Sequence, residues 1–121
     1  MAEVCRNEPL LAFFSGENSL LDGQIRKIGI YVTGASVCID IDFRMRPSSA
    51  FREIQFRFLG CRAYAFAFSD DHYFYNVQSL KFFRCADGLY YISFDPVDET
   101  ETVSDEDQDF IVCREVVAVT L

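Results

Sequence analysis

The sequence of 121 residues lacks most of the signals that enzymes and membrane proteins carry. Its six glycines are all isolated, so it contains no GxSxG, P-loop or GxGxxG motif. No apolar run approaches the ~18–20 residues that a membrane-spanning helix needs. The N-terminus has acids before its short apolar patch and no basic stretch, which argues against a secretory signal peptide. We therefore expect a cytoplasmic protein that is not an enzyme and contacts no membrane.

Metal and redox sites have as little support. The five cysteines are odd in number and form no CxxC pair, which excludes a zinc ribbon or a thioredoxin-type site. We interpret them as free thiols packed as small apolar side chains in a reducing cytosol, with a disulfide or a reactive thiol as the alternative. They are Cys5, Cys38, Cys61, Cys85 and Cys113.

The single histidine, His72, lies in the run 69–73, between Asp71 and Tyr73. A base beside carboxylates could act in catalysis or bind a metal. A turn explains the same residues, because Ser and Asp favour turns and the run interrupts an alternating pattern. We favour the turn, and we predict no catalytic residue and no cofactor.

Basic residues are too few for a conventional nucleic-acid binder. The net charge is −8, from 19 acids against 11 bases, whereas binding to a phosphate backbone requires a basic surface. The whole excess lies in residues 95–109, which hold eight acids and no base, and the rest of the chain is neutral. The eight acids are Asp95, Asp98, Glu99, Glu101, Asp105, Glu106, Asp107 and Asp109.

The rest of the chain predicts a single β-rich domain over residues 1–121. Apolar and polar residues alternate with a period of two, which is typical of half-buried strands. We expect an α+β, predominantly antiparallel fold of about seven strands, in a curved sheet or a sandwich. Short turns at 33–35 and 86–88 predict hairpins. The expected strands are 25–33, 36–45, 52–59, 61–68, 79–85, 89–94 and 110–119.

Two elements of this prediction are more specific. In 61–68 both faces are apolar, so we predict a central strand covered on both sides. One short N-terminal helix is expected in 8–21, with Asn7 as its N-cap and Pro9 in its first turn, and with Gly16 shortening it.

The acidic stretch has several interpretations. Asp105, Asp107 and Asp109 match the start of a calcium loop, but Phe110 replaces the required glycine, and we predict no metal. A solvated loop that maintains solubility is the plainest alternative. A dense negative patch tethered between two strands would also attract a basic partner and speed its association.

The stretch from Ser-Phe-Asp-Pro (93–96) through Ser-Asp-Glu-Asp (104–107) to a closing strand resembles the C-terminal part of small bacterial immunity proteins. These belong to polymorphic-toxin and contact-dependent growth inhibition systems. The segment from Leu10 into the first strands shares that resemblance. It implies a cytosolic protein that binds and neutralises one cognate toxin, often a nuclease.

We therefore predict an immunity protein that covers the basic active-site surface of a toxin domain and binds no nucleic acid directly. The predicted contact residues are the eight acids of 95–109, extended by Asp70 and Asp71, with Tyr73 and Tyr75 as aromatic anchors. Burial in the phenylalanine-rich core is the alternative for the two tyrosines. The rival functions are an acidic adaptor or nucleic-acid mimic that binds a basic host protein, and a small-molecule-binding β domain.

Overall fold

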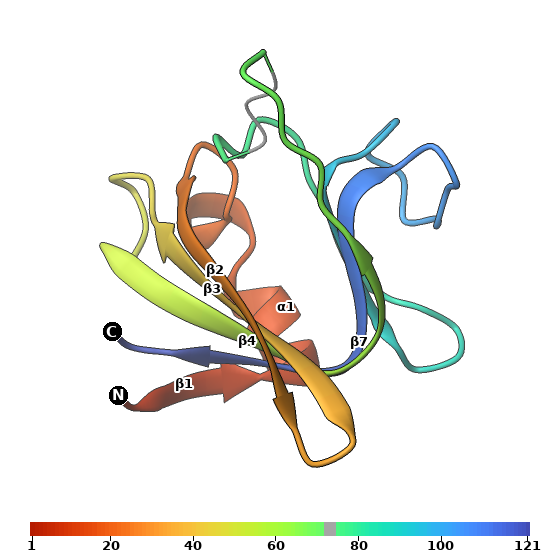
Figure 1. Ribbon diagram of the computed structural model, residues 1–121. Coiled ribbons are helices and arrows are strands. Elements are labelled where there is room, and N and C mark those ends of the chain that lie inside the picture. The colour runs from red at the N-terminus through yellow and green to blue at the C-terminus, as the bar shows by residue number, and fades with distance from the viewer. Residues whose placement is uncertain (72–74) are drawn as a thin grey trace.

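The computed structural model describes residues 1–71 and 75–121, and it forms one open, curved antiparallel sheet (Figure 1). The strand order is β2-β3-β4-β7-β6-β5, with β1 paired to β7. The predicted class, antiparallel β with one short helix, is confirmed. The strands are β1 (Glu3–Arg6), β2 (Gln24–Thr33), β3 (Ser36–Arg44), β4 (Glu53–Ala65), β5 (Lys81–Arg84), β6 (Tyr90–Asp95) and β7 (Gln108–Val119).

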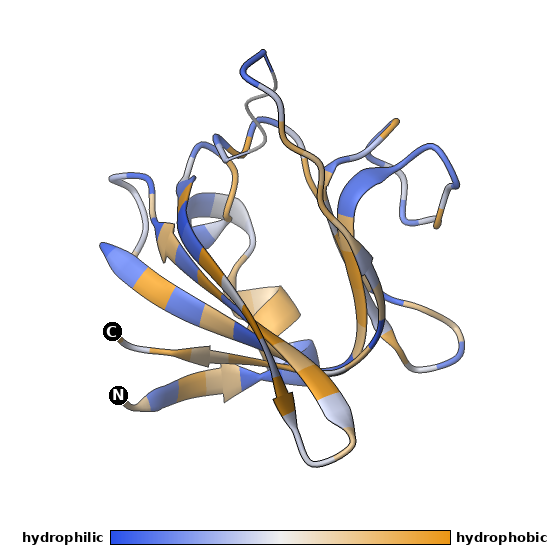
Figure 2. Ribbon diagram, viewed as in Figure 1, coloured by the Kyte–Doolittle hydropathy of each residue, from blue (hydrophilic) through white to orange (hydrophobic). Residues whose placement is uncertain are grey.

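The period-two pattern sets the register between β3 and β4. Ile39 lies opposite Phe58 and Ile41 opposite Phe56, and all four side chains are fully buried on the concave face. Figure 2 shows the alternation of apolar and polar residues along the first half of β4. A shift of one residue would expose these side chains, so burial specifies the register.

β4 joins two segments that the sequence predicts as separate strands, 52–59 and 61–68. Gly60, with φ 63°, and a register shift between Cys61 and Ala63 bend the strand where they meet. The prediction that 61–68 is covered on both sides is wrong, because Ala63 and Ala65 are exposed and Tyr64 is 42% exposed. The bend turns this half of β4 away from the helix and along β7 (Figure 1).

The N-terminal helix is shorter than the predicted 8–21. α1 (Asn7–Phe13) is followed by a 3₁₀ turn, η1 (Gly16–Asn18), and Gly16 has φ 59°. The predicted N-cap role of Asn7 is wrong: the residue lies inside α1, and its Oδ1 accepts a hydrogen bond from the Val116 amide at 3.0 Å. Sequence reasoning also missed β1, which immediately precedes the helix.

The helix covers the concave face of the sheet. Leu10 is fully buried, and the ring of Phe14, just after the helix, meets that of Phe56 edge to face at 4.9 Å.

No helix among residues 1–71 and 75–121 is long and apolar enough to cross a membrane. The five cysteines are all free thiols.

Gly60 provides a test of the bend in β4. A Cβ at Gly60 would meet the Arg114 side chain at 3.2–3.3 Å, and its positive φ disfavours any L side chain. Gly60→Ala should lower the free energy of unfolding by about 1–2 kcal/mol in urea titrations. The control is Gly29→Ala, where a Cβ meets nothing within 4 Å. Equal losses in the two variants would contradict a special role for the bend.

Candidate functional site

The acidic segment 95–109 is a loop closed by strands at both ends. Asp95 is the last residue of β6, Asp109 lies in β7, and residues 96–107 connect them. The eight carboxylates do not share one environment. Asp107 is 5% and Asp109 2% exposed, and Asp95 is half-buried. The exposed members are Asp98, Glu99, Glu101, Asp105 and Glu106.

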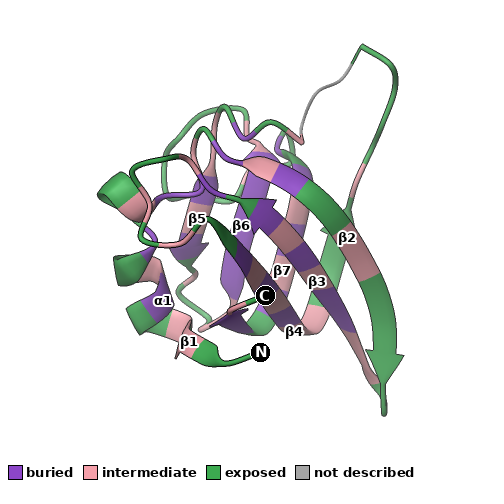
Figure 3. Ribbon diagram, turned by 90° about the vertical axis from the view of Figure 1, so that its left-hand side faces the viewer, coloured by how far each residue is buried: buried purple, intermediate pink, exposed green. Residues whose placement is uncertain are grey.

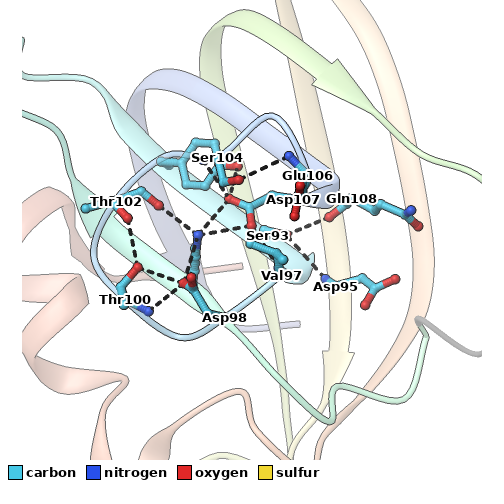
Figure 4. Close-up of polar contacts among 12 residues, drawn as sticks. Ser93, Asp95, Val97, Asp98, Thr100, Thr102, Ser104, Glu106, Asp107 and Gln108 are labelled. Atoms are coloured by element: carbon cyan, nitrogen blue, oxygen red, sulfur yellow. Dashed lines mark hydrogen bonds and ion pairs between the residues drawn. The ribbon is translucent and has the colours of Figure 1, made fainter.

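Asp107 is the point on which the loop closes (Figure 4). Its carboxylate accepts hydrogen bonds from the backbone amides of Val97, at 2.9 Å, and Ser104, at 3.1 Å. It also accepts one from the Tyr91 hydroxyl at 2.7 Å. One side chain therefore ties the beginning and the end of the loop to β6.

Lys81 of β5 is the ionic partner of Asp107. Its side chain is fully buried, and Nζ lies 2.9 and 3.0 Å from the two carboxylate oxygens of Asp107. Nζ also donates to the carbonyl oxygen of Thr102 at 2.8 Å and lies 3.4 Å from a carboxylate oxygen of Asp98. The ammonium group has three donors, and three oxygen-bearing residues surround it. No buried side-chain nitrogen or oxygen in the described part of the chain lacks a hydrogen-bond partner.

The loop covers the convex face of the sheet. Phe82 points to the concave core, where its ring lies 6.0 Å from that of Phe56, so its neighbours Lys81 and Phe83 point to the opposite face. There Phe83 packs on Tyr91, with ring centroids 5.5 Å apart. The ion pair thus lies over a small aromatic cluster outside the main core.

The pKa directions agree with a charged pair. Desolvation by itself lowers the pKa of Lys81, but the hydrogen bonds to Asp107 and Asp98 outweigh it and raise that pKa above its ordinary value. Desolvation by itself raises the pKa of Asp107, but the combined hydrogen bonds from Val97, Tyr91, Lys81 and Ser104 lower it. Burial, and then the bond to Asp107, raise the pKa of Tyr91.

Asp109 links the loop base to the end of β4. It has φ 49°, and its Oδ1 accepts a hydrogen bond from the Ala67 amide at 2.9 Å. The segment after Ala67 leads to Asp70 and Asp71, both exposed. In Figure 1 this segment and the acidic loop leave the same end of the sheet with their tips pointing apart.

The two predicted aromatic anchors have different outcomes. Tyr75 is half-buried and packs against the hydrophobic core, and its carbonyl oxygen accepts a hydrogen bond from the Ile25 amide at 2.7 Å. This position agrees with the alternative of burial. The predictions for Tyr73 and for His72 concern positions outside the described residues.

The prediction that all eight acids form a contact surface needs correction for two of them. Asp107 and Asp109 are buried and hold the loop in shape, so a partner cannot reach them in this conformation. The carboxylate of Asp107 is paired with the ammonium group of Lys81, which lies where a bound metal ion would otherwise have to lie. Within residues 1–71 and 75–121, no group of three or more metal-ligating side chains is positioned to hold a metal ion.

Sequence reasoning missed Lys81 and Tyr91. One signal was present: Lys81 begins the short strand 81–84, where the period of two places it on the same face as the large apolar side chain of Phe83. A lysine at such a position is rarely buried without an acidic partner. The signal does not say which of eight nearby acids in the sequence is that partner.

Comparisons of the chain with protein-family models, with curated proteins and with solved structures found no match.

Asp107→Asn tests the closure of the loop. The amide keeps the shape of the side chain but leaves the buried ammonium group of Lys81 without its main counter-charge. We expect a loss of about 3 kcal/mol in the free energy of unfolding, measured by urea denaturation. The matched control is Asp105→Asn, an exposed neighbour, which should change stability by less than about 0.5 kcal/mol. Equal effects would contradict the structural role of Asp107.

The same pair predicts a pH dependence. The pKa of Asp107 is lower in the folded protein than its ordinary value of 3.8, so its contribution to stability is present above that value. This contribution is lost as the pH falls through the folded-state pKa. The stability difference between wild type and Asp107→Asn should be constant from about pH 5 to 8 and shrink below about pH 4. A difference that stays constant down to pH 2 in chemical denaturation would refute this assignment.

Proposed function

We propose that this chain is a cytoplasmic immunity protein that neutralises a basic toxin domain, a nuclease, by covering its active-site surface. The observation that carries the proposal is that some acids of the loop are buried and hold its shape, whereas others are exposed. A buried ion pair orders the loop, and five exposed carboxylates remain on its outside, with no Lys or Arg between 95 and 109. Holding the loop in one conformation lowers the entropy cost of binding.

The chemistry of inhibition follows from what carboxylates share with phosphates. Arg and Lys side chains that hold a phosphate also pair with a carboxylate. Asp105 and Glu106 lie in the turn of the loop, and Glu99 and Glu101 lie along its first half. Such a surface would occupy the phosphate positions of a nuclease site, and its field would speed association at low salt.

Asp70 and Asp71 belong to the proposed surface as an outlying part. The bond between Asp109 and Ala67 joins the bases of the two acidic segments, although their tips diverge. We therefore assign the main role to the loop and a secondary role to these two residues.

An acidic adaptor or nucleic-acid mimic remains the second candidate, because the same exposed carboxylates would serve it. Such a protein would bind several unrelated basic proteins, whereas an immunity protein discriminates sharply between toxins. A small-molecule-binding domain would retain an apolar ligand through purification. Pull-down from the source cell, together with the gene adjacent to that of this protein, distinguishes the three.

The electrostatic contact is tested by the double variant Asp105→Lys with Glu106→Lys. Neither side chain makes a hydrogen bond or ion pair within the described structure, so the fold should persist. We expect at least a tenfold slower association with the toxin encoded beside its gene, and a weaker dependence of the rate on salt. The measurement is stopped-flow or surface-plasmon kinetics across ionic strength, with a protection assay in cells.

The control variant carries the same change of charge elsewhere. Glu17 and Glu53 are exposed and lie outside the loop, so Glu17→Lys with Glu53→Lys should leave protection intact. If both double variants slow association equally, net charge matters and the loop does not. If the loop variant binds with unchanged rate and salt dependence, the toxin contacts another surface.

A further inference from the structure

The two edge strands of the sheet, β5 and β2, are covered to different extents. At one end, β5 lies beside α1, and Arg84 forms an ion pair with Glu8 of the helix at 2.5 Å. At the other end, β2 is paired on one side to β3. On its outer side, segment 75–77 contacts only the beginning of β2, through Gln24 and Ile25.

From Arg26 onward, no other segment of the described chain pairs with the outer edge of β2. Figure 3 shows this edge as a largely exposed strip along one side of the molecule. An open edge of this length normally carries charges, a proline or a covering element that prevents pairing with another chain. In the stretch 28–32 the sequence is Ile-Gly-Ile-Tyr-Val, which has none of these and has high β propensity.

Two aliphatic side chains of this stretch are unusually exposed for their type. Ile30 is 46% and Val32 69% exposed, although both point to the concave face, opposite the buried Ile39 and the half-buried Val37. On the other face, a Cβ at Gly29 would meet nothing within 4 Å. The apolar face of the sheet therefore continues to this edge, and none of residues 1–71 and 75–121 covers Ile30 and Val32 fully.

The hairpin geometry tells which backbone groups face outward. β2 and β3 are joined by a two-residue turn between Thr33 and Ser36, which makes these two the hydrogen-bonded pair nearest the turn. Because such pairs alternate along an antiparallel ladder, the amide and carbonyl groups of Ile28, Ile30 and Val32 point away from β3. The exposed Ile30 and Val32 and the half-buried Ile28 thus offer their backbone hydrogen bonds at the edge.

We propose that this edge, residues 26–33, pairs with the same edge of a second copy of the chain, antiparallel and centred on Ile30. In that register Ile28 lies opposite Val32 of the other copy, and Ile30 lies opposite itself. Each of these pairs exchanges two backbone hydrogen bonds, and their side chains form one apolar stripe. The contact is symmetric, as a twofold dimer requires.

A second copy fits this edge without a like-charge contact, because in the proposed register no basic side chain lies opposite another. β2 carries Arg26 and Lys27 and no acid. In the register centred on Ile30, Lys27 faces Thr33 and Arg26 faces Gly34, so the cations of the two copies stand at opposite ends. The acidic loops connect β6 to β7, away from β2 in the strand order, so the contact leaves them free for a toxin.

Self-association is tested on the purified full-length chain by sedimentation and by light scattering over a range of concentrations. We expect a concentration-dependent species of about twice the 13.9 kDa of one chain. Val32→Lys should raise the dissociation constant at least about tenfold, since the substitution occurs twice in a symmetric dimer. The control is Val103→Lys, which replaces a valine that is 57% exposed elsewhere and should leave the dissociation constant unchanged.

Cross-linking tests the register independently of affinity. A short bis-maleimide should join a mixture of Ile28→Cys and Val32→Cys chains far better than either variant alone, above the background of the native cysteines. Self-linking of Ile28→Cys alone would indicate a parallel pairing and overturn the proposal. A monomer at every concentration tested, with wild-type and Val32→Lys chains indistinguishable, would overturn it as well.

Discussion

The buried pair of Lys81 and Asp107 is the interaction on which the candidate site depends. The carboxylate of Asp107 accepts hydrogen bonds from the amides of Val97 and Ser104, from the hydroxyl of Tyr91 and from the ammonium group of Lys81. One residue therefore joins both ends of the loop to the convex face. A buried ion pair adds little net stability compared with apolar residues of the same shape, but removal of one partner is costly. Its contribution here is to specify one conformation for a loop whose charges repel one another.

The acids of the loop therefore have two different roles. Part of the negative charge is structural: Asp107 is neutralised internally, Asp98 shares the same ammonium group, and Asp109 fixes the end of β4. The rest is displayed to solvent on a loop that is already ordered. A surface of that kind suits a partner whose Arg and Lys side chains are themselves fixed around a phosphate site. The sheet provides the platform, and β2, whose outer edge pairs with no described segment from Arg26 onward, lies at the other end of the strand order from that surface.

Most of the fold could be predicted from the sequence, because alternation in β3 and β4 and the turn residues at 33–35 are local signals. The predictions that failed depend on contacts between residues that are far apart in the sequence. The two apolar faces of 61–68 suggested a covered strand, but the bend at Gly60 carries that half of β4 away from the helix. Asn7 suggested an N-cap, but its side chain binds Val116, more than a hundred residues away. Within the site, the charge of the loop was evident, whereas the burial of Asp107 and Asp109 depends on partners in β5 and β4 that no local pattern identifies.

Amide hydrogen exchange at Val97 and Ser104 reports on the closure of the loop by Asp107 and Lys81, because both amides donate to Asp107 and neither belongs to a strand. Both amides should exchange slowly in the wild-type chain. In Lys81→Met, both should exchange rapidly while the amides of β3 and β4 stay protected. Fast exchange at both positions in the wild type, or unchanged protection in Lys81→Met, would contradict an acidic loop ordered by this ion pair.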